Sequence, residues 1–156
     1  MNSHHSKPSA QEAEKILFKL YHLKGKAFRL PGFVDFNFKI VIDGETQYIL
    51  KISRENSNNK LRFLLQDILI YLEKVSTDLM IPQIISDQNG NFTSEICNGN
   101  KKQTVRLLSW VSGRIWNDVN PRLDKLHYSL GETCGKLTRA LLNFKHSEAH
   151  GKFEWD

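Results

Sequence analysis

A tight turn between two alternating segments is the feature that most constrains the fold of this chain. Apolar residues recur at every second position over residues 36–42 and again over residues 48–52, a period that predicts two half-buried strands. Asp43-Gly44 lies between the two segments, and this pair favours the positive backbone angles of a two-residue hairpin turn. Residues 27–30 predict a third strand, joined to the hairpin through a bend over residues 31–35. The three segments therefore predict an antiparallel meander.

Segments with helical spacing precede and follow this meander. Ser9 and Glu12 have the spacing of a capping box. Apolar residues then recur every three or four positions up to residue 23, with Gly25 as the stop signal. A second apolar stripe over residues 61–75 predicts a helix directly after the third strand. Further strands are predicted at residues 82–86, 92–96 and 103–110.

The last part of the chain predicts one long helix. Asn120 is placed to cap this helix and Pro121 to open it, because proline is tolerated at the first helical position. Apolar residues follow at steps of three and four through residue 144. Gly131 and Gly135 lie inside this segment at a helix-propensity cost of about 1 kcal/mol each, which predicts close packing against a neighbour.

This order of elements predicts an α+β fold, with an antiparallel sheet of about five strands, a helix inserted after the third strand and further helices at the flanks. The 156 residues fit one domain of ordinary size. Lys and Arg number 22 against 17 Asp and Glu, and the net charge is +5. This excess would suit any polyanion, but it is spread along the chain and by itself predicts only a solubilising surface.

Composition excludes several classes of protein and site. No apolar run approaches the roughly 20 residues of a membrane helix, and residues 1–10 lack the apolar region of a signal peptide. We therefore expect a cytoplasmic protein without a membrane partner. Cys97 and Cys134 are too few for a disulfide framework and predict two reduced thiols. His146 and His150 lie four apart, but the glutamate of a zinc protease does not follow the first histidine, so we predict no metal site.

The residues that best fit a chemical role lie in the bend and on the strand one hairpin later. Gly32 lacks a side chain, so the backbone amides of the bend can approach a phosphate closely. Lys51, on a rigid strand, would place a positive charge at the α- and β-phosphates of ATP, as in kinase-like folds. The adenine would lie between Phe38 or Ile40 and Ile49, which shares a strand face with Lys51. The alternative is a surface hairpin with a solvated lysine, and no GxGxxG motif is present.

The order of several motifs resembles one family. The resemblance rests on the runs LPGFVDFNFKI, YILKIS, VRLLSWVSGR and LGETCGKLTRALLNFKHSEAHGKFEWD. They are similar to the amino-terminal lobe of the aminoglycoside phosphotransferase family, and within it to the hydroxylysine-kinase-like and homoserine-kinase-like branch. Similar lobes also open long polypeptides that carry a class-III aminotransferase domain. The resemblance covers residues 12–156.

This resemblance implies a nucleotide site. Lys51 would be the phosphate-binding lysine, and Ser109-Trp110-Val111 would be the hinge, whose backbone carbonyl and amide hold the adenine edge. Gly113 would be the point where the chain turns toward a second lobe. The implied nucleotide loop consists of Gly32, Phe33, Val34, Asp35 and Asn37.

The chain departs from the family pattern in two ways. Family kinases pair the strand lysine with a helix carboxylate, but residues 61–75 offer only Asp67 and Glu73, neither at a convincing register for Lys51. The family's catalytic His-Gly-Asp loop is also missing, because residues 150–152 read His-Gly-Lys. We therefore expect no catalytic residue and no metal ligand in this chain, and we interpret it as a fragment that is inactive alone. The expected parts are a flexible terminus at 1–8, the nucleotide-binding lobe at 9–112, and at 113–156 a connection and helix leading to a missing carboxy-terminal lobe.

The resemblance implies that the parent protein is a small-molecule kinase. It would transfer the γ-phosphate of ATP to a hydroxyl of an amino acid, amine or aminoglycoside-like acceptor, with Mg²⁺ bound by the missing lobe. One alternative is a non-catalytic kinase-like domain of a class-III aminotransferase polypeptide. Another is a module that binds RNA or a protein, although we expect a nucleotide rather than nucleic acid. Leucines of the last helix would be exposed without the second lobe, which predicts self-association of the fragment.

Overall fold

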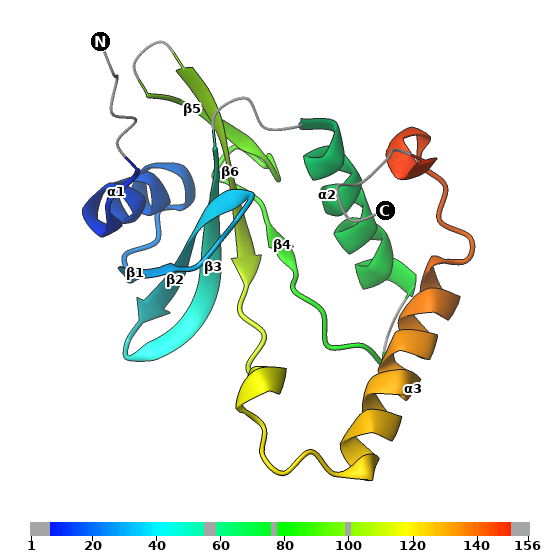
Figure 1. Cartoon of the computed structure of the whole chain (residues 1–156). Helices are drawn as coiled ribbons and strands as arrows, with labels where there is room; N and C mark the ends of the chain where they lie inside the picture. Colours follow the sequence, from blue (N-terminus) through cyan, green and yellow to red (C-terminus); the bar gives the residue numbers. More distant parts are fainter. Residues whose placement is uncertain (1–6, 55–58, 76–77, 99–100, 151–156) are drawn as a thin grey trace, which may run out of the picture. The chain divides into compact units, whose positions relative to one another are not determined.

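The computed structural model describes residues 7–54, 59–75, 78–98 and 101–150. The chain forms two compact units, one from Met1–Ser57 and Ile84–Trp110 and the other from Asn58–Gln83 and Val111–Asp156. Figure 1 draws the elements of both units. Residues 1–6 of the predicted flexible terminus, and residues 151–152 of the His-Gly-Lys run, lie outside the described residues.

The first helix, α1 (Ala10–Tyr21), begins where the capping box predicts. The Ser9 hydroxyl accepts a hydrogen bond from the Glu12 amide at 3.2 Å, and the Glu12 carboxylate accepts one from the Ser9 amide at 2.7 Å. Two free donors of the helix start are thereby satisfied. The predicted stop at Gly25 is wrong, because His22 already adopts the left-handed conformation (φ 53) that ends a helix.

The predicted meander is confirmed. The strands β1 (Lys26–Leu30), β2 (Asp35–Ile42) and β3 (Glu45–Ser53) pair antiparallel in this order. Asp43 and Gly44 connect β2 to β3 with φ angles of 51 and 84, the positive angles that a tight hairpin turn requires. Because a tight turn fixes the pairing register, it also decides which side chains share a face of the sheet.

Three more strands complete the sheet: β4 (Ile84–Ile85), β5 (Ser94–Asn98) and β6 (Lys101–Ser109). The strand order is β1-β2-β3-β6-β4, and β5 also pairs with β6. All of these pairings are antiparallel. The described part of the chain therefore has six strands, each at one of the six predicted segments, and the shortest is the two-residue β4.

One face of the sheet packs against α1 to form the hydrophobic core, and Figure 1 shows the helix beside β1. Alternate residues of β2, β3 and β6 point to this face, as the two-residue period predicts. Each large apolar side chain buried there contributes about 1.5–3 kcal/mol. The buried core residues are Ala13, Leu17, Tyr21, Ala27, Phe38, Ile40, Leu50, Ile52, Val105 and Leu107.

The second unit contains α2 (Asn59–Val75), α3 (Asp124–Leu141) and two short 3₁₀ turns, Trp116–Asp118 and Ser147–His150. The predicted lobe at 9–112 includes the residues of α2. In the structure, the contacts of α2 group it with the second unit.

The segment after α3 packs onto α2. The His146 Nε2 atom lies 3.3 Å from a carboxylate oxygen of Asp67, and the ring centroids of Phe144 and Tyr71 are 5.1 Å apart. The turn itself adds a contact, since a carboxylate oxygen of Glu148 lies 3.3 Å from the Lys60 Nζ atom of α2. Two polar contacts and one aromatic contact therefore hold this segment on α2.

The start of α3 differs from the prediction. The Asn120–Pro121 peptide is cis, and Leu123 takes the cap position without a side-chain hydrogen bond. The helix therefore begins at Asp124, whose charge is favourable beside the helix amino terminus. A Cβ placed on Gly131 or Gly135 would meet nothing within 4 Å, so the predicted close packing at these two glycines is wrong.

No residue of α3 is buried, as the prediction of exposed leucines requires. Its exposed large apolar side chains are Tyr128, Leu130 and Leu137, and Leu123 and Leu142 at the two caps are exposed as well. Self-association through such side chains stays a prediction.

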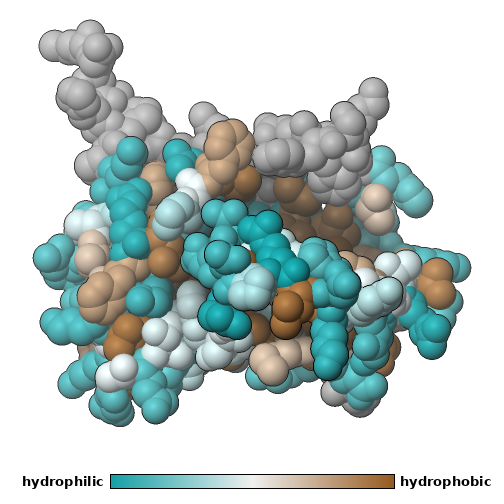
Figure 2. All heavy atoms as spheres, turned by 60° about the horizontal axis from the view of Figure 1, so that its bottom comes forward, coloured by the Kyte–Doolittle hydropathy of each residue, from teal (hydrophilic) through white to brown (hydrophobic). Residues whose placement is uncertain are grey.

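On the face drawn in Figure 2, hydrophilic and hydrophobic side chains are interspersed. Within the described ranges, no helix is long and apolar enough to cross a membrane.

A buried carboxylate fixes the turn between β4 and β5. The Asp87 Oδ1 atom accepts hydrogen bonds from the amides of Asn89 (2.8 Å) and Asn91 (2.9 Å), and Oδ2 accepts one from the Ser94 hydroxyl (2.7 Å). Burial disfavours the charged carboxylate, but the hydrogen bonds outweigh this effect and hold the pKa of Asp87 below its usual value.

We expect Asp87→Asn to lower the free energy of unfolding by about 1–3 kcal/mol at neutral pH, because the amide replaces a carboxylate that accepts from several donors. Since the native pKa of Asp87 is lowered, its stabilisation is complete above the ordinary aspartate pKa and is lost as the pH falls through the native value. Denaturant unfolding followed by circular dichroism should therefore show the gap between wild type and variant shrinking at about pH 3. Asp43→Asn, in the exposed turn, is the matched control. A gap that is equal at both pH values would contradict this account.

Candidate functional site

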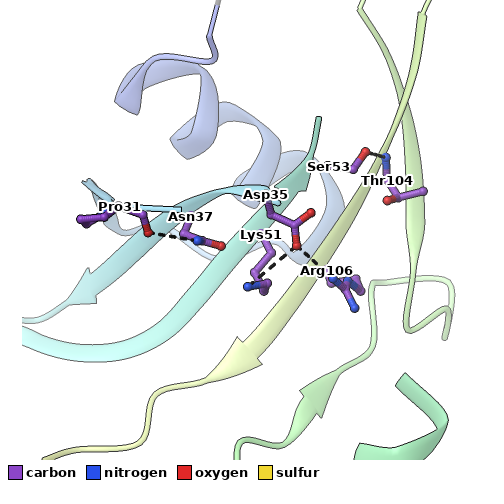
Figure 3. Close-up of polar contacts among 7 residues, drawn as sticks. All are labelled: Pro31, Asp35, Asn37, Lys51, Ser53, Thr104 and Arg106. Carbon is purple, nitrogen blue, oxygen red and sulfur yellow. Dashed lines mark hydrogen bonds and ion pairs between the residues drawn. The ribbon is translucent and has the colours of Figure 1, made fainter. Parts of the chain in front are cut away.

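The face of the sheet opposite the core carries three charged side chains close together (Figure 3). Lys51 of β3 lies opposite Arg106 of β6 and opposite Asn37 of β2, and directly opposed residues share a face. Asp35 lies two residues before Asn37 and thus on the same face. Its carboxylate receives both cationic side chains. We call Asp35, Lys51 and Arg106 the charged cluster.

Distance and burial distinguish the two ion pairs of the charged cluster. The Arg106 Nη2 atom donates to Asp35 Oδ2 at 3.1 Å, and these side chains are only 6% and 5% exposed. The Lys51 Nζ atom lies 3.8 Å from the same oxygen, beyond hydrogen-bond distance, and the Lys51 side chain is 25% exposed. The three groups carry one net positive charge, and Lys51 is the cation that a ligand can reach.

The bend before β2 is held by hydrogen bonds to two of its carbonyls. Asn37 Nδ2 donates to the Pro31 carbonyl at 3.2 Å, and Arg54 Nη2 donates to the Gly32 carbonyl at 2.8 Å. A Cβ on Gly32 would fall within 3.0 Å of the Asn37 side chain and of the Asp35 carbonyl. Only glycine fits there without displacing its neighbours.

The remaining residues of the predicted nucleotide loop separate into exposed and buried groups. Phe33 and Val34 form the exposed tip of the bend, with 77% and 53% of their surface accessible. Asp35, in contrast, is buried and directs its carboxylate to the charged cluster. A direct contact between Asp35 and the nucleotide stays a prediction.

The predicted adenine contacts of Phe38 and Ile40 are also wrong. Both side chains are fully buried in the core on the α1 side of the sheet. Ile49 lies on the opposite face with Lys51, because it alternates along β3 with the core residue Leu50. The sheet itself separates Phe38 and Ile40 from that face.

An apolar pair lies beside the charged cluster on the outer face. Ile49 is opposite Leu108 in the register of β3 and β6, one step along from the pair of Lys51 and Arg106. Ile84 of β4 lies on the other side of Leu108. Leu108 is not among the predicted site residues, because its place beside Ile49 depends on the pairing of β3 with β6, which no local sequence pattern encodes.

The three residues of the predicted hinge, Ser109-Trp110-Val111, belong to two different units. Ser109 is the last residue of β6, and the Trp110 amide donates to the Gln47 carbonyl at 2.8 Å. This amide is therefore already paired within the sheet and is not the donor to an adenine edge. Val111 begins the segment that belongs to the second unit.

The carboxylates that the sequence offered as partners of Lys51 are engaged elsewhere. Asp67 pairs with His146 at 3.3 Å, and Glu73 accepts a hydrogen bond from Gln83 at 3.4 Å. The carboxylate beside Lys51 comes instead from Asp35 on the neighbouring strand.

No metal ligand set is assigned. In the part of the chain that the structure describes, no group of three or more His, Cys, Asp or Glu side chains could hold an ion. Asp35 is the carboxylate of the charged cluster, and two cations already face it. The described residues do not fit the Mg²⁺ that the resemblance implies, and we derive no step through that ion.

No family model and no curated protein matches this chain. Several solved structures share its fold, among them two kinases. An amicoumacin kinase in complex with AMP-PNP, Ca²⁺ and Ami is 18% identical with a TM-score of 0.69, and the match covers 90% of this chain and 42% of that one. A microcompartment-associated aminopropanol kinase is 16% identical with a TM-score of 0.68, and the match covers 95% and 45%. The chain thus spans less than half the length of either kinase.

These likenesses establish the fold. The α+β class and the antiparallel sheet of a kinase-like amino-terminal lobe, both predicted from the sequence, are confirmed. The hydroxylysine-kinase and homoserine-kinase branch and the link to an aminotransferase stay predictions.

We expect Arg106→Met to lower the free energy of unfolding by about 3 kcal/mol, because removal of one partner leaves the buried Asp35 carboxylate with weaker compensation. Lys102→Met on the same strand removes an exposed ion pair to Glu95 and should cost less than about 1 kcal/mol. Denaturant unfolding followed by circular dichroism measures both. Equal losses in the two variants would show that the Arg106 pair has no special weight in the fold.

Proposed function

We propose that this chain is the ATP-binding lobe of a small-molecule kinase. The observation that carries the proposal is the placement of Lys51, the accessible cation of a cluster with one net positive charge, next to an apolar pair on the outer face of the sheet. A nucleotide requires this combination, since its base is a flat, largely apolar ring and its phosphates are anionic.

The order of residues along β3 matches the order of base and phosphates along a nucleotide. Ile49 and Leu108 come first and would support the adenine, and Lys51 follows on the same face and would meet the α- and β-phosphates. The bend with Gly32 leads directly into Asp35 of the charged cluster. Its backbone amides would then contribute to phosphate binding.

In the proposed site, the backbone of the hinge would bind the edge of the adenine. With the Trp110 amide engaged by Gln47, the adenine edge would be held by other backbone groups of Ser109-Trp110-Val111.

The acceptor proposed for the whole protein is a hydroxyl on an amino acid, amine or aminoglycoside-like molecule. Both structural neighbours are kinases of small molecules, and one of them was solved with AMP-PNP and Ca²⁺. ATP and a divalent cation are accordingly the proposed cofactors. When bound, the cation would neutralise charge on the phosphates during transfer.

Nucleotide binding and turnover are separate expectations for this chain. Phosphoryl transfer depends on positioning, on a group that orients the attacking hydroxyl and on metal-held charge neutralisation. We assign neither the group that orients the hydroxyl nor the metal ligands to the described residues. We therefore expect the 156-residue chain to bind ATP without turning it over.

Lys51→Met should weaken ATP binding by about tenfold or more, because a charge-assisted contact to phosphate contributes roughly 1.5–3 kcal/mol. Isothermal titration calorimetry with ATP and ADP measures the effect. Lys102→Met is the matched control, since Lys102 is another ion-paired lysine of the same sheet and lies on β6 away from the charged cluster.

Binding of ATP that is indifferent to Lys51, or no binding by the wild-type chain, would contradict the proposed function. Tight RNA binding that weakens steeply with salt would instead favour the alternative of a nucleic-acid-binding module.

A further inference from the structure

We infer that Asp35 is a positioning residue that holds Lys51 in place for the phosphates, and that Arg106 is the counter-ion that keeps this carboxylate fixed and largely neutralised. The inference rests on the proposed nucleotide site. It gives the lysine of that site a carboxylate partner from the neighbouring strand β2.

The first step concerns the anchoring of Asp35. Its side chain is 5% exposed, and a carboxylate so far from water needs a charged hydrogen-bond partner. Arg106 supplies one at 3.1 Å from a strand that is itself paired to β3, β4 and β5. Both ends of this ion pair therefore belong to the rigid interior of the sheet, and the carboxylate oxygen that Lys51 faces has a fixed position.

The second step concerns the charge left on Lys51. If Asp35 had Lys51 alone as its cation, the pair would be neutral and would have little attraction for a phosphate. Arg106 offsets the carboxylate through the shorter contact, and Lys51 stands at 3.8 Å from the same oxygen. Lys51 is thus oriented by a carboxylate and still contributes the one net positive charge of the cluster.

The third step links the cluster to the bend. Gly32 packs so closely on the Asp35 carbonyl and the Asn37 side chain that a Cβ would not fit. Asn37, which also holds the Pro31 carbonyl, lies opposite Lys51 in the sheet. Asp35 and Asn37 of β2 therefore contact both parts of the proposed phosphate site. One part is the backbone of the bend, and the other is Lys51.

The inference opposes what simple charge counting predicts for Asp35→Asn. This substitution raises the net charge of the cluster by one, so electrostatic attraction alone would strengthen ATP binding. A positioning role predicts the reverse, because Lys51 loses the carboxylate contact that orients it and must be ordered when the phosphates bind. We expect ATP and ADP to bind about tenfold more weakly, the factor that corresponds to about 1.4 kcal/mol.

The experiment titrates the full chain and its variants with ATP, ADP and adenosine, by calorimetry for the nucleotides and by ligand-observed NMR for adenosine. Asp35→Asn should weaken ATP and ADP and leave adenosine unchanged, which general damage to the fold would not do. Asp43→Asn, another carboxylate-to-amide change on the hairpin, is the matched control and should leave all three affinities unchanged. Arg106→Lys keeps the charge without the planar fork and should weaken ATP by a smaller factor, so it tests the same inference if Asp35→Asn does not fold.

The outcomes separate the inference from the function on which it rests. If wild type binds ATP and Asp35→Asn binds it equally or more tightly, the positioning role is overturned while the nucleotide site stands. If adenosine weakens as much as ATP, the role of Asp35 is structural and the inference is likewise overturned. A wild-type chain that does not bind ATP overturns the proposed function, and the inference with it.

Discussion

The alternation of side chains along β2, β3 and β6 is the constraint on which both the core and the candidate site depend. Successive residues of a strand point to opposite faces. Leu50 and Leu107 therefore close the core against α1, while Lys51 and Arg106 must lie together on the other face. A slip of one residue in β3 would bring Lys51 into the core, where an unpaired ammonium group is strongly disfavoured. The register that the apolar residues enforce thus also assembles the charged cluster.

The buried pair of Arg106 and Asp35 is difficult to explain by stability alone. Removal of two charges from water is unfavourable, and apolar side chains of similar volume would often stabilise a fold equally well. The third residue of the charged cluster, Lys51, suggests a role for the ion pair other than stability. Lys51 shares the Asp35 oxygen at a longer distance and is the accessible group of the three. The buried arginine allows the carboxylate to orient the lysine without neutralising the cluster.

Features that depend on neighbouring residues in the sequence could be predicted, and features that depend on strand order could not. The capping box at Ser9 and the hairpin turn at Asp43-Gly44 are local, and the structure has both. The pairing of Asp35 with Arg106 joins residues 71 positions apart, across strands whose adjacency no local pattern encodes. One signal was present nonetheless: Arg106 lies directly between the apolar residues Val105 and Leu107, where a buried charged side chain requires a partner. The alternation of β2 likewise already placed Phe38 on the core face.

The identity to the two solved kinases is low, so the positions of individual residues carry the argument about function. A shared fold at 18% identity says that the sheet is built alike, and a function must then be argued from the residues on it. The carboxylate beside Lys51 is supplied by the first unit itself, and its placement follows from the register of β2, β3 and β6. A lysine fixed in this way before a ligand arrives loses little freedom on binding. In the proposed nucleotide site, the sheet would therefore present an ordered positive charge to the phosphates.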